Sequence, residues 1–136
     1  MSTCAEIQFK DAEETFAIHQ HSDGYPEGEH GVIAAIEKSI PYAWRDGRFE
    51  AAEFACAYIR ANKARQGGLY LLKDPTDLAK EVSALYLYVV TSNGESLTID
   101  YFKEDFATEK YAKVGQATMA LSEEPPAIFT KRAGFW

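Results

Sequence analysis

Three histidines within twelve residues of the chain are the side chains best suited to chemistry. His19 and His21 form a His-x-His pair and His30 follows, with Asp23 and Glu27 between them. In a strand, residues two apart point the same way, so both imidazoles could bind one divalent ion. A third side chain would complete the coordination of that ion. The same His-x-His pattern also occurs on the solvent-exposed face of ordinary hairpins, where it binds nothing. We therefore predict no bound metal and no other cofactor, with His19, His21 and His30 as the alternative ligand set.

His21 and Asp23 also suggest a general acid–base pair, in which Asp23 orients His21 and the Tyr25 loop supplies a pocket. No Gly-x-Ser-x-Gly nucleophile and no phosphate-binding loop accompanies them. The competing interpretation is a rigid turn, in which Asp23 caps the backbone and Gly24 adopts a positive φ. The sequence favours the turn and a protein that is not an enzyme. A small enzyme or ligand-binding domain using His21, Asp23 and Tyr25 is the alternative.

The charge of the chain is concentrated in one stretch. The net charge is −7, and the residues between Lys10 and Lys38 include seven acids and no lysine or arginine. Such a stretch repels phosphate backbones, so we expect no direct contact with nucleic acid, and it attracts a basic protein surface. We predict a protein-binding surface along this stretch, made by Glu13, Glu14, Asp23, Tyr25, Glu27 and Glu29. A solvated surface is the simpler explanation of the same charges.

The elements that must position these residues follow from periodicity. Strands are predicted where apolar residues alternate or cluster, at residues 5–9, 15–21, 69–72, 85–90 and 97–102. Helical spacing predicts helices over residues 32–40 and about 49–65, and a weaker pattern predicts one over 104–119. Asn93-Gly94 is a strong hairpin signal, so the last two strands should pair antiparallel. Four residues are predicted to lie in the core beneath that pair: Val32, Ile36, Phe54 and Ile59.

These elements predict an α+β fold in the order β-β-α-α-β-β-β. We expect a mainly antiparallel sheet of about five strands, with two helices packed on one face. Residues 1–103 form this unit, and residues 104–136 are a C-terminal extension, a weak helix and a proline-broken tail, of the same single domain. The first residues lack the basic start and the apolar stretch of a signal peptide, so we expect none, and no apolar run reaches the ~20 residues that span a bilayer. With only Cys4 and Cys56, both expected to be reduced, we predict a cytoplasmic protein that does not bind membranes.

The segment of residues 18–28, Ile-His-Gln-His-Ser-Asp-Gly-Tyr-Pro-Glu-Gly, resembles a family of small uncharacterised proteins of phages, prophages and plasmids. That family carries a His-(Trp/Ser)-Asp-Gly-Tyr-Pro signature, which His21 and residues 23–26 match. His19 departs from it, because the family tends to have an aromatic residue there. A metal site that needs His19 would therefore be peculiar to this chain. Weaker similarity continues at residues 66–71 and 85–89.

The resemblance implies a mobile-element origin, a bacterial host cell and an unassigned function. Phage proteins of this size are often acidic and block basic nucleic-acid-binding surfaces by charge complementarity. We therefore expect a binding protein, and the sequence suggests an inhibitor of a host defence system such as CRISPR. Its partner would be a basic, nucleic-acid-binding host protein.

Overall fold

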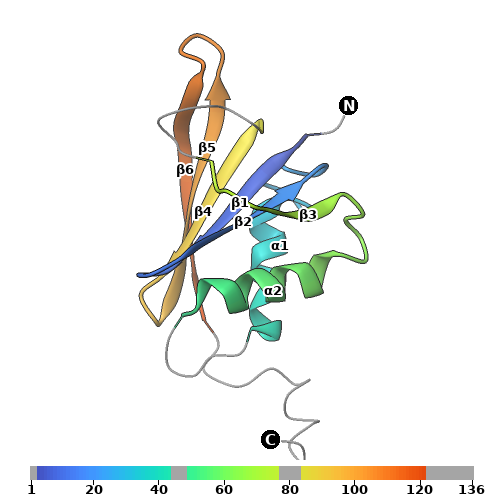
Figure 1. Ribbon diagram of the computed structural model, residues 1–136, viewed down its shortest axis with the longest axis vertical. Coiled ribbons are helices and arrows are strands. Elements are labelled where there is room, and N and C mark those ends of the chain that lie inside the picture. The colour runs from blue at the N-terminus through green and yellow to red at the C-terminus, as the bar shows by residue number, and fades with distance from the viewer. Residues whose placement is uncertain (1–2, 44–48, 77–83, 122–136) are drawn as a thin grey trace, which may run out of the picture.

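The protein is built on one six-stranded mixed sheet, in the order β3-β2-β1-β4-β5-β6 (Figure 1). The computed structural model describes residues 3–43, 49–76 and 84–121. Neighbouring strands are antiparallel except β1 and β4, which run parallel. The strands are β1 (Ala5–Lys10), β2 (Thr15–Gln20), β3 (Leu69–Leu72), β4 (Tyr86–Ser92), β5 (Ser96–Asp105) and β6 (Lys110–Ala120).

Both helices cover the same face of this sheet. They are α1 (Val32–Ser39), which continues into a 3-10 turn (Ile40–Tyr42) containing Pro41, and α2 (Ala51–Asn62). The ring of Phe9 on β1 packs against Phe54 and Tyr58 of α2, with ring centroids 5.8 and 5.7 Å away. Val32 and Ile36 of α1 join the same buried cluster. The α+β class and the helices on one face, as predicted from the sequence, are confirmed.

The core prediction is confirmed for the residues that face the sheet. Val32, Ile36 and Phe54 are buried, and Ile59 is partly buried against them. The predicted pairing of the last two apolar strands is also confirmed, because β4 and β5 are antiparallel neighbours. Gly94 in the turn between them has a φ of 96°, which suits glycine in a tight hairpin.

Thr76, which follows β3, contacts the face of the sheet opposite the helices. Glu6 and Gln8 of β1 point to that face, yet both are buried. Thr76 lies over them: its N–H and Oγ1 donate to the Glu6 carboxylate at 2.7 and 2.5 Å, and its carbonyl accepts from Gln8 at 2.9 Å. β3 and β1 are both antiparallel to β2, and β4 pairs parallel with β1 on its other side. Sequence periodicity does not reveal such a pairing.

The helix predicted over residues 104–119 is wrong, because this segment completes β5 and forms β6. The predicted boundary at residue 103 therefore falls inside β5, and residues up to 120 belong to the sheet. The apolar residues that suggested a helix do not share a buried face: Phe106 is 75% exposed and Val114 is 51% exposed. The segment instead alternates, with Gly115, Ala117 and Met119 opposite Tyr101, Ile99 and Leu97. The proline-broken tail lies outside the described residues.

Neither described helix is long and apolar enough to cross a bilayer. Within the part of the chain that the structure describes, Cys4 and Cys56 are free thiols, partly buried and exposed respectively.

Candidate functional site

The Asp-Gly-Tyr-Pro loop between β2 and α1 is held by hydrogen bonds to three other parts of the chain. The N–H of Gly24 donates to the carbonyl of Thr3 at 2.8 Å, and its carbonyl accepts from the Tyr88 hydroxyl at 2.6 Å. The side chain of Gln20 donates to the carbonyls of Ser22 and Asp23 and accepts from the buried Tyr58 hydroxyl. These bonds join the loop to the chain before β1, to β4 and, through Gln20, to α2.

Asp23 ties this loop to the end of α2. Its carboxylate accepts hydrogen bonds from Gln66 and Arg65, both at 3.0 Å, and from the Tyr25 hydroxyl at 3.3 Å. The hydrogen bond from Gln66 is the main cause that lowers the pKa of Asp23 below its ordinary value, and the Arg65 charge adds to it. Asp23 is therefore a negatively charged connector between the loop and the C-terminal end of α2.

Gly24 is required here for a different reason from the one the sequence suggested. The residue with positive φ in this turn is Asp23, at 55°, and Gly24 does not lie in the left-handed region. A Cβ on Gly24 would instead lie 2.7 Å from the Thr3 carbonyl oxygen and 2.9 Å from the Cβ of Ala5. The expectation of a positive φ at Gly24 is thus wrong, and close approach of the β1 entry explains the glycine.

The structure does not join His21 to Asp23. Among the described residues, no hydrogen bond connects the two side chains, whereas Asp23 is bound by Gln66, Arg65 and Tyr25. The His21 backbone N–H donates to the Gly68 carbonyl at 3.1 Å, and its side chain lies close to Gly68. A catalytic pair of His21 and Asp23 therefore lacks the contact it needs in this conformation.

The three histidines lie in two places. His19 stacks on Tyr70 with centroids 4.8 Å apart and lies 6.4 Å from the His21 ring, as a His-x-His pair should. His30 lines a different hollow, beside Lys38 and Arg65. Over the ranges the structure describes, no three His, Cys, Asp or Glu side chains are placed to share a metal ion. The absence of a bound metal stays a prediction.

The predicted acidic surface is divided between the two ends of the β1–β2 hairpin. Glu13 and Glu14 lie in the turn that follows β1, whereas Glu27 and Glu29 lie in the loop that follows β2. Because β1 and β2 are antiparallel, these loops lie at opposite ends of six-residue strands, roughly 20 Å apart. Asp23 and Tyr25 belong to the second end. The acidic residues of this stretch therefore form two separate clusters of negative charge, one at each end of the hairpin.

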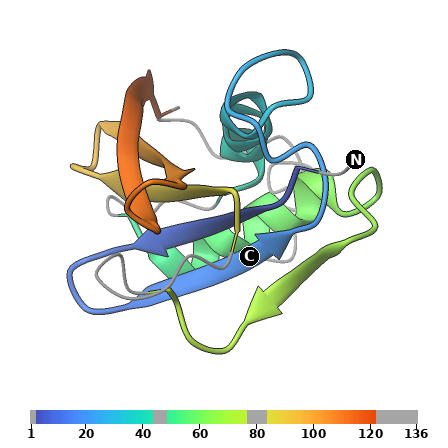
Figure 2. The ribbon, with the colours of Figure 1, turned by 90° about the horizontal axis from the view of Figure 1, so that it is seen from above.

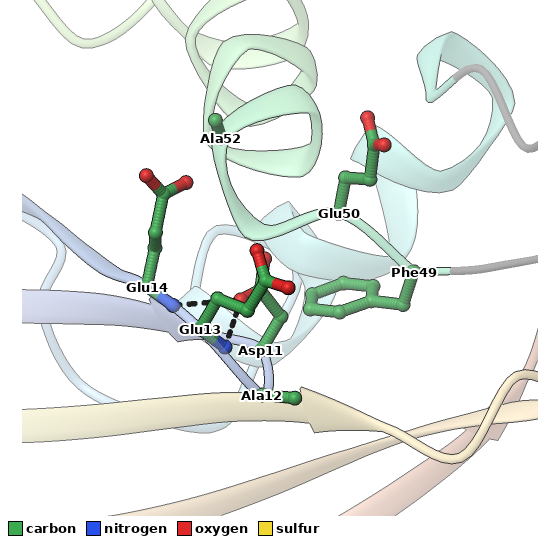
Figure 3. A pocket seen from close by; sticks show the side chains of 7 residues that line it. All are labelled: Asp11, Ala12, Glu13, Glu14, Phe49, Glu50 and Ala52. Carbon is green, nitrogen blue, oxygen red and sulfur yellow. Dashed lines mark hydrogen bonds between the residues drawn. The ribbon is translucent and has the colours of Figure 1, made fainter.

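At the first end, the acidic turn faces the start of α2 across a hollow of about 430 Å³ (Figure 3). Asp11 holds the turn and the helix start together around this hollow. One of its carboxylate oxygens accepts hydrogen bonds from the N–H groups of Glu13 and Glu14 at 2.9 and 2.8 Å. The other accepts from the N–H of Ala51, the first residue of α2, at 2.9 Å. The hollow is lined by Asp11, Ala12, Glu13, Glu14, Phe49, Glu50 and Ala52. In the described ranges its lining holds no basic side chain.

Sequence reasoning missed Phe49 and Glu50 as members of this acidic end. They are 35 or more positions from Glu13 and Glu14 in the chain. Only the contact between Asp11 and the first turn of α2 brings them together. An acidic residue just before a helix was the available signal, but it is ordinarily explained by the helix dipole.

A second hollow, of about 410 Å³, is rich in tyrosine. Tyr25 from the loop lines it together with Tyr86 of β4 and Tyr101 of β5. Tyr88, which lies between these two strand tyrosines, stacks on Tyr86 with centroids 6.2 Å apart. The Lys103 ammonium lies 5.6 Å from the centre of the Tyr86 ring. The loop motif therefore contributes Tyr25 and Pro26 to a tyrosine-lined groove, and Glu27, the next residue, also lines it.

Comparison with protein-family models, with curated proteins and with solved structures finds no match to this chain. The resemblance of residues 18–28 to a phage family stays a prediction.

Proposed function

We propose that this protein acts by binding a basic macromolecular partner, and that it is not a catalyst. One observation carries the proposal: Glu13 and Glu14 border a hollow of about 430 Å³ that contains an aromatic ring and several carboxylates. A hollow of this kind suits a lysine or arginine side chain, because Glu13 and Glu14 would pair with its charge and Phe49 would pack against its stem.

The wider context of the proposal comes from the sequence. A net charge of −7 disfavours nucleic acid as a direct partner and favours a basic protein that itself binds nucleic acid. With the resemblance to phage proteins, we extend the proposal to an inhibitor of a host defence system, such as CRISPR, in the bacterial cytoplasm. Complementary charge would raise the association rate more than the equilibrium affinity.

We test the proposal by comparing the partner affinities of two charge-reversal variants. Glu13→Lys/Glu14→Lys alters the hollow, and Glu27→Lys/Glu29→Lys changes the net charge equally at the other end of the hairpin. Asp11 stays unchanged, because it holds the turn and α2 in place. A partner is first captured from host lysate by the wild-type protein and identified by mass spectrometry, and its affinity is then measured for each variant.

We expect the Glu13/Glu14 variant to bind at least tenfold more weakly, and the Glu27/Glu29 variant to bind like the wild type. Wild-type affinity should fall as salt rises from about 50 to about 500 mM, because screening weakens exposed charge pairs. Equal binding by the Glu13/Glu14 variant, or an equal loss in both variants, would contradict the proposal.

Ligand binding at the tyrosine groove is the second candidate function, because Tyr25 of the loop motif lines it with Tyr86 and Tyr101. It predicts a different result in the same measurement: Glu13→Lys/Glu14→Lys binds normally, whereas Tyr25→Ala loses binding and Glu27→Lys/Glu29→Lys weakens it, because Glu27 lines this groove. Tyr70→Ala is the matched control, since Tyr70 is exposed and lies on β3 outside the groove. If His21→Ala or Asp23→Asn abolished activity in a folded protein, the enzyme alternative would be favoured instead.

A further inference from the structure

The two edge strands of the sheet differ in how they are protected (Figure 2). β3 has only four residues and is followed by Lys73, Asp74 and Pro75, which are features that stop a sheet from being extended. β6 has eleven residues and lies at the opposite edge. No strand in the described part of the chain pairs with its outer side. A long open edge of this kind is a template for another strand.

The backbone groups available on β6 follow from two hydrogen bonds. The N–H of Leu121 donates to the Glu95 carbonyl of the β4–β5 turn at 3.0 Å, so this residue points toward β5. Because direction alternates along an antiparallel strand, Met119, Ala117 and Gly115 also point toward β5. The hydrogen bond from the Glu104 N–H to the Leu85 carbonyl places the alternate residues of β5 toward β4, which agrees with this assignment. Gln116, Thr118 and Ala120 therefore direct their N–H and C=O groups outward.

The side chains of the same segment do not oppose pairing. Residues 114–120, Val-Gly-Gln-Ala-Thr-Met-Ala, contain no charge and no proline. The nearest charge, Lys113, is bound to Asp100 of its own sheet at 2.9 Å, and Gln116 donates to the same carboxylate at 2.6 Å. This stretch thus lacks the lysines and prolines that usually protect an edge.

We propose that β6 pairs antiparallel with β6 of a second copy of this chain, which joins the two sheets into one. A register centred on Ala117 places Gln116 opposite Thr118 and Val114 opposite Ala120. Gln116 and Thr118 form a pair whose outward backbone groups can bond across a two-fold axis, whereas Val114 lies at the register shift opposite Tyr101 and Phe102. Every pair within residues 114–120 is then uncharged on both sides. Charge favours this edge for self-association, because β4 and β5 separate it from the Glu13–Glu14 end by roughly 14 Å in each copy.

Thr118→Pro tests this pairing with little effect on the chain's own fold. Proline removes the outward N–H of residue 118, which is not used in the ladder to β5, and edge strands tolerate proline. Thr118→Val is the matched control, because it keeps the N–H and the β-branched shape. Thr118→Lys is a second variant that places two like charges near the axis without changing the backbone.

The mass of the full chain is measured by sedimentation and light scattering over a concentration series, with circular dichroism and melting as checks of folding. We expect the wild type and Thr118→Val to reach twice 15.2 kDa, and Thr118→Pro and Thr118→Lys to stay monomeric. Amide exchange at residues 116 and 118 should slow only as the dimer forms.

A wild-type monomer at all concentrations, or a folded Thr118→Pro protein that still dimerises, would overturn the proposal. So would slow exchange at these amides in the monomer, since another part of the chain would then cover the edge. The result is independent of the proposed function, because the Glu13→Lys/Glu14→Lys variant should dimerise normally.

Discussion

At the scale of single residues, the Asp-Gly-Tyr-Pro loop is made of side chains that hold one another in place. Asp23 accepts hydrogen bonds from three side chains. The N–H and the carbonyl of Gly24 both form hydrogen bonds, to Thr3 and Tyr88. Residues of types common in active sites can thus serve to fix a loop. For this loop, the partners of each polar atom are more informative than the residue types.

Gly24→Ala is expected to destabilise the fold by about 1–3 kcal/mol, the usual cost of forcing extra atoms into a packed site. The added Cβ would lie 2.7 Å from the Thr3 carbonyl oxygen and force the loop away from β1. Chemical denaturation measures the free energy of unfolding. Gly67→Ala is the control, because a Cβ there meets nothing within 4 Å. Equal stabilities for the two variants would show that the loop is less closely packed than we describe.

His19 should make stability depend on pH below neutrality. Burial, and then the nearby His21, lower the pKa of His19 below its ordinary value of 6.5, although Glu6 acts in the opposite direction. As the pH falls, the unfolded chain takes up this proton before the folded protein does. The contribution of neutral His19 to the free energy of unfolding is therefore complete above pH 6.5. It is lost as the pH falls through the pKa of His19 in the folded state.

Denaturation at a series of pH values measures this effect. In His19→Gln, the free energy of unfolding should fall less steeply below pH 6.5 than in the wild type. The same slope in both proteins would rule out His19 as its source.

At the scale of elements, Asp11 joins the first hairpin to α2. The helix has Glu50 as its N-cap residue, whose side chain makes no capping hydrogen bond, and Asp11 from another element accepts a hydrogen bond from the N–H of Ala51. One carboxylate therefore organises the β1–β2 turn and satisfies a donor at the start of α2. This contact also forms the wall of the acidic hollow.

Asp11→Ala should cost about 0.5–2 kcal/mol of stability, which is the range for losing a helix cap. Thermal and chemical unfolding measure the loss. Glu13→Ala is the control, because only the backbone N–H of Glu13 takes part in the turn, and its effect should stay within about 0.5 kcal/mol. If Asp11→Ala were as stable as this control, the contact with α2 would contribute nothing to stability.

At the scale of the whole molecule, the topology decides where the charges and the open edges lie. The β1–β2 hairpin separates Glu13 and Glu14 from Glu27 and Glu29, although they belong to one acidic stretch of sequence. This separation makes the charge-reversal experiment selective, because each pair of acids can be changed without altering the other. The same topology leaves β6 at an edge, where its uncharged segment is accessible to a second copy.

The sequence by itself determined the elements whose signals are local. The strands of the first hairpin, the Asn93-Gly94 turn, both helices and the core positions Val32, Ile36 and Phe54 follow from apolar periodicity and turn residues. The rigid nature of the Asp-Gly-Tyr-Pro loop was also predictable, because Asp, Gly and Pro each restrict a turn in a known way.

The tertiary structure alone decided what depends on contacts between distant residues. β6 read as a weak helix, because Phe106 and Val114 fall at helical spacing, and the pairing of Gly115, Ala117 and Met119 with β5 overrode that pattern. The parallel pairing of β1 with β4, and the hydrogen bonds from Thr76 to Glu6, join residues that are far apart in the chain. Phe49 and Glu50 meet Glu13 and Glu14 only because Asp11 binds the first turn of α2. Local periodicity carries no information about such contacts, because they are stabilised by packing and hydrogen bonds between segments that only the folded chain brings together.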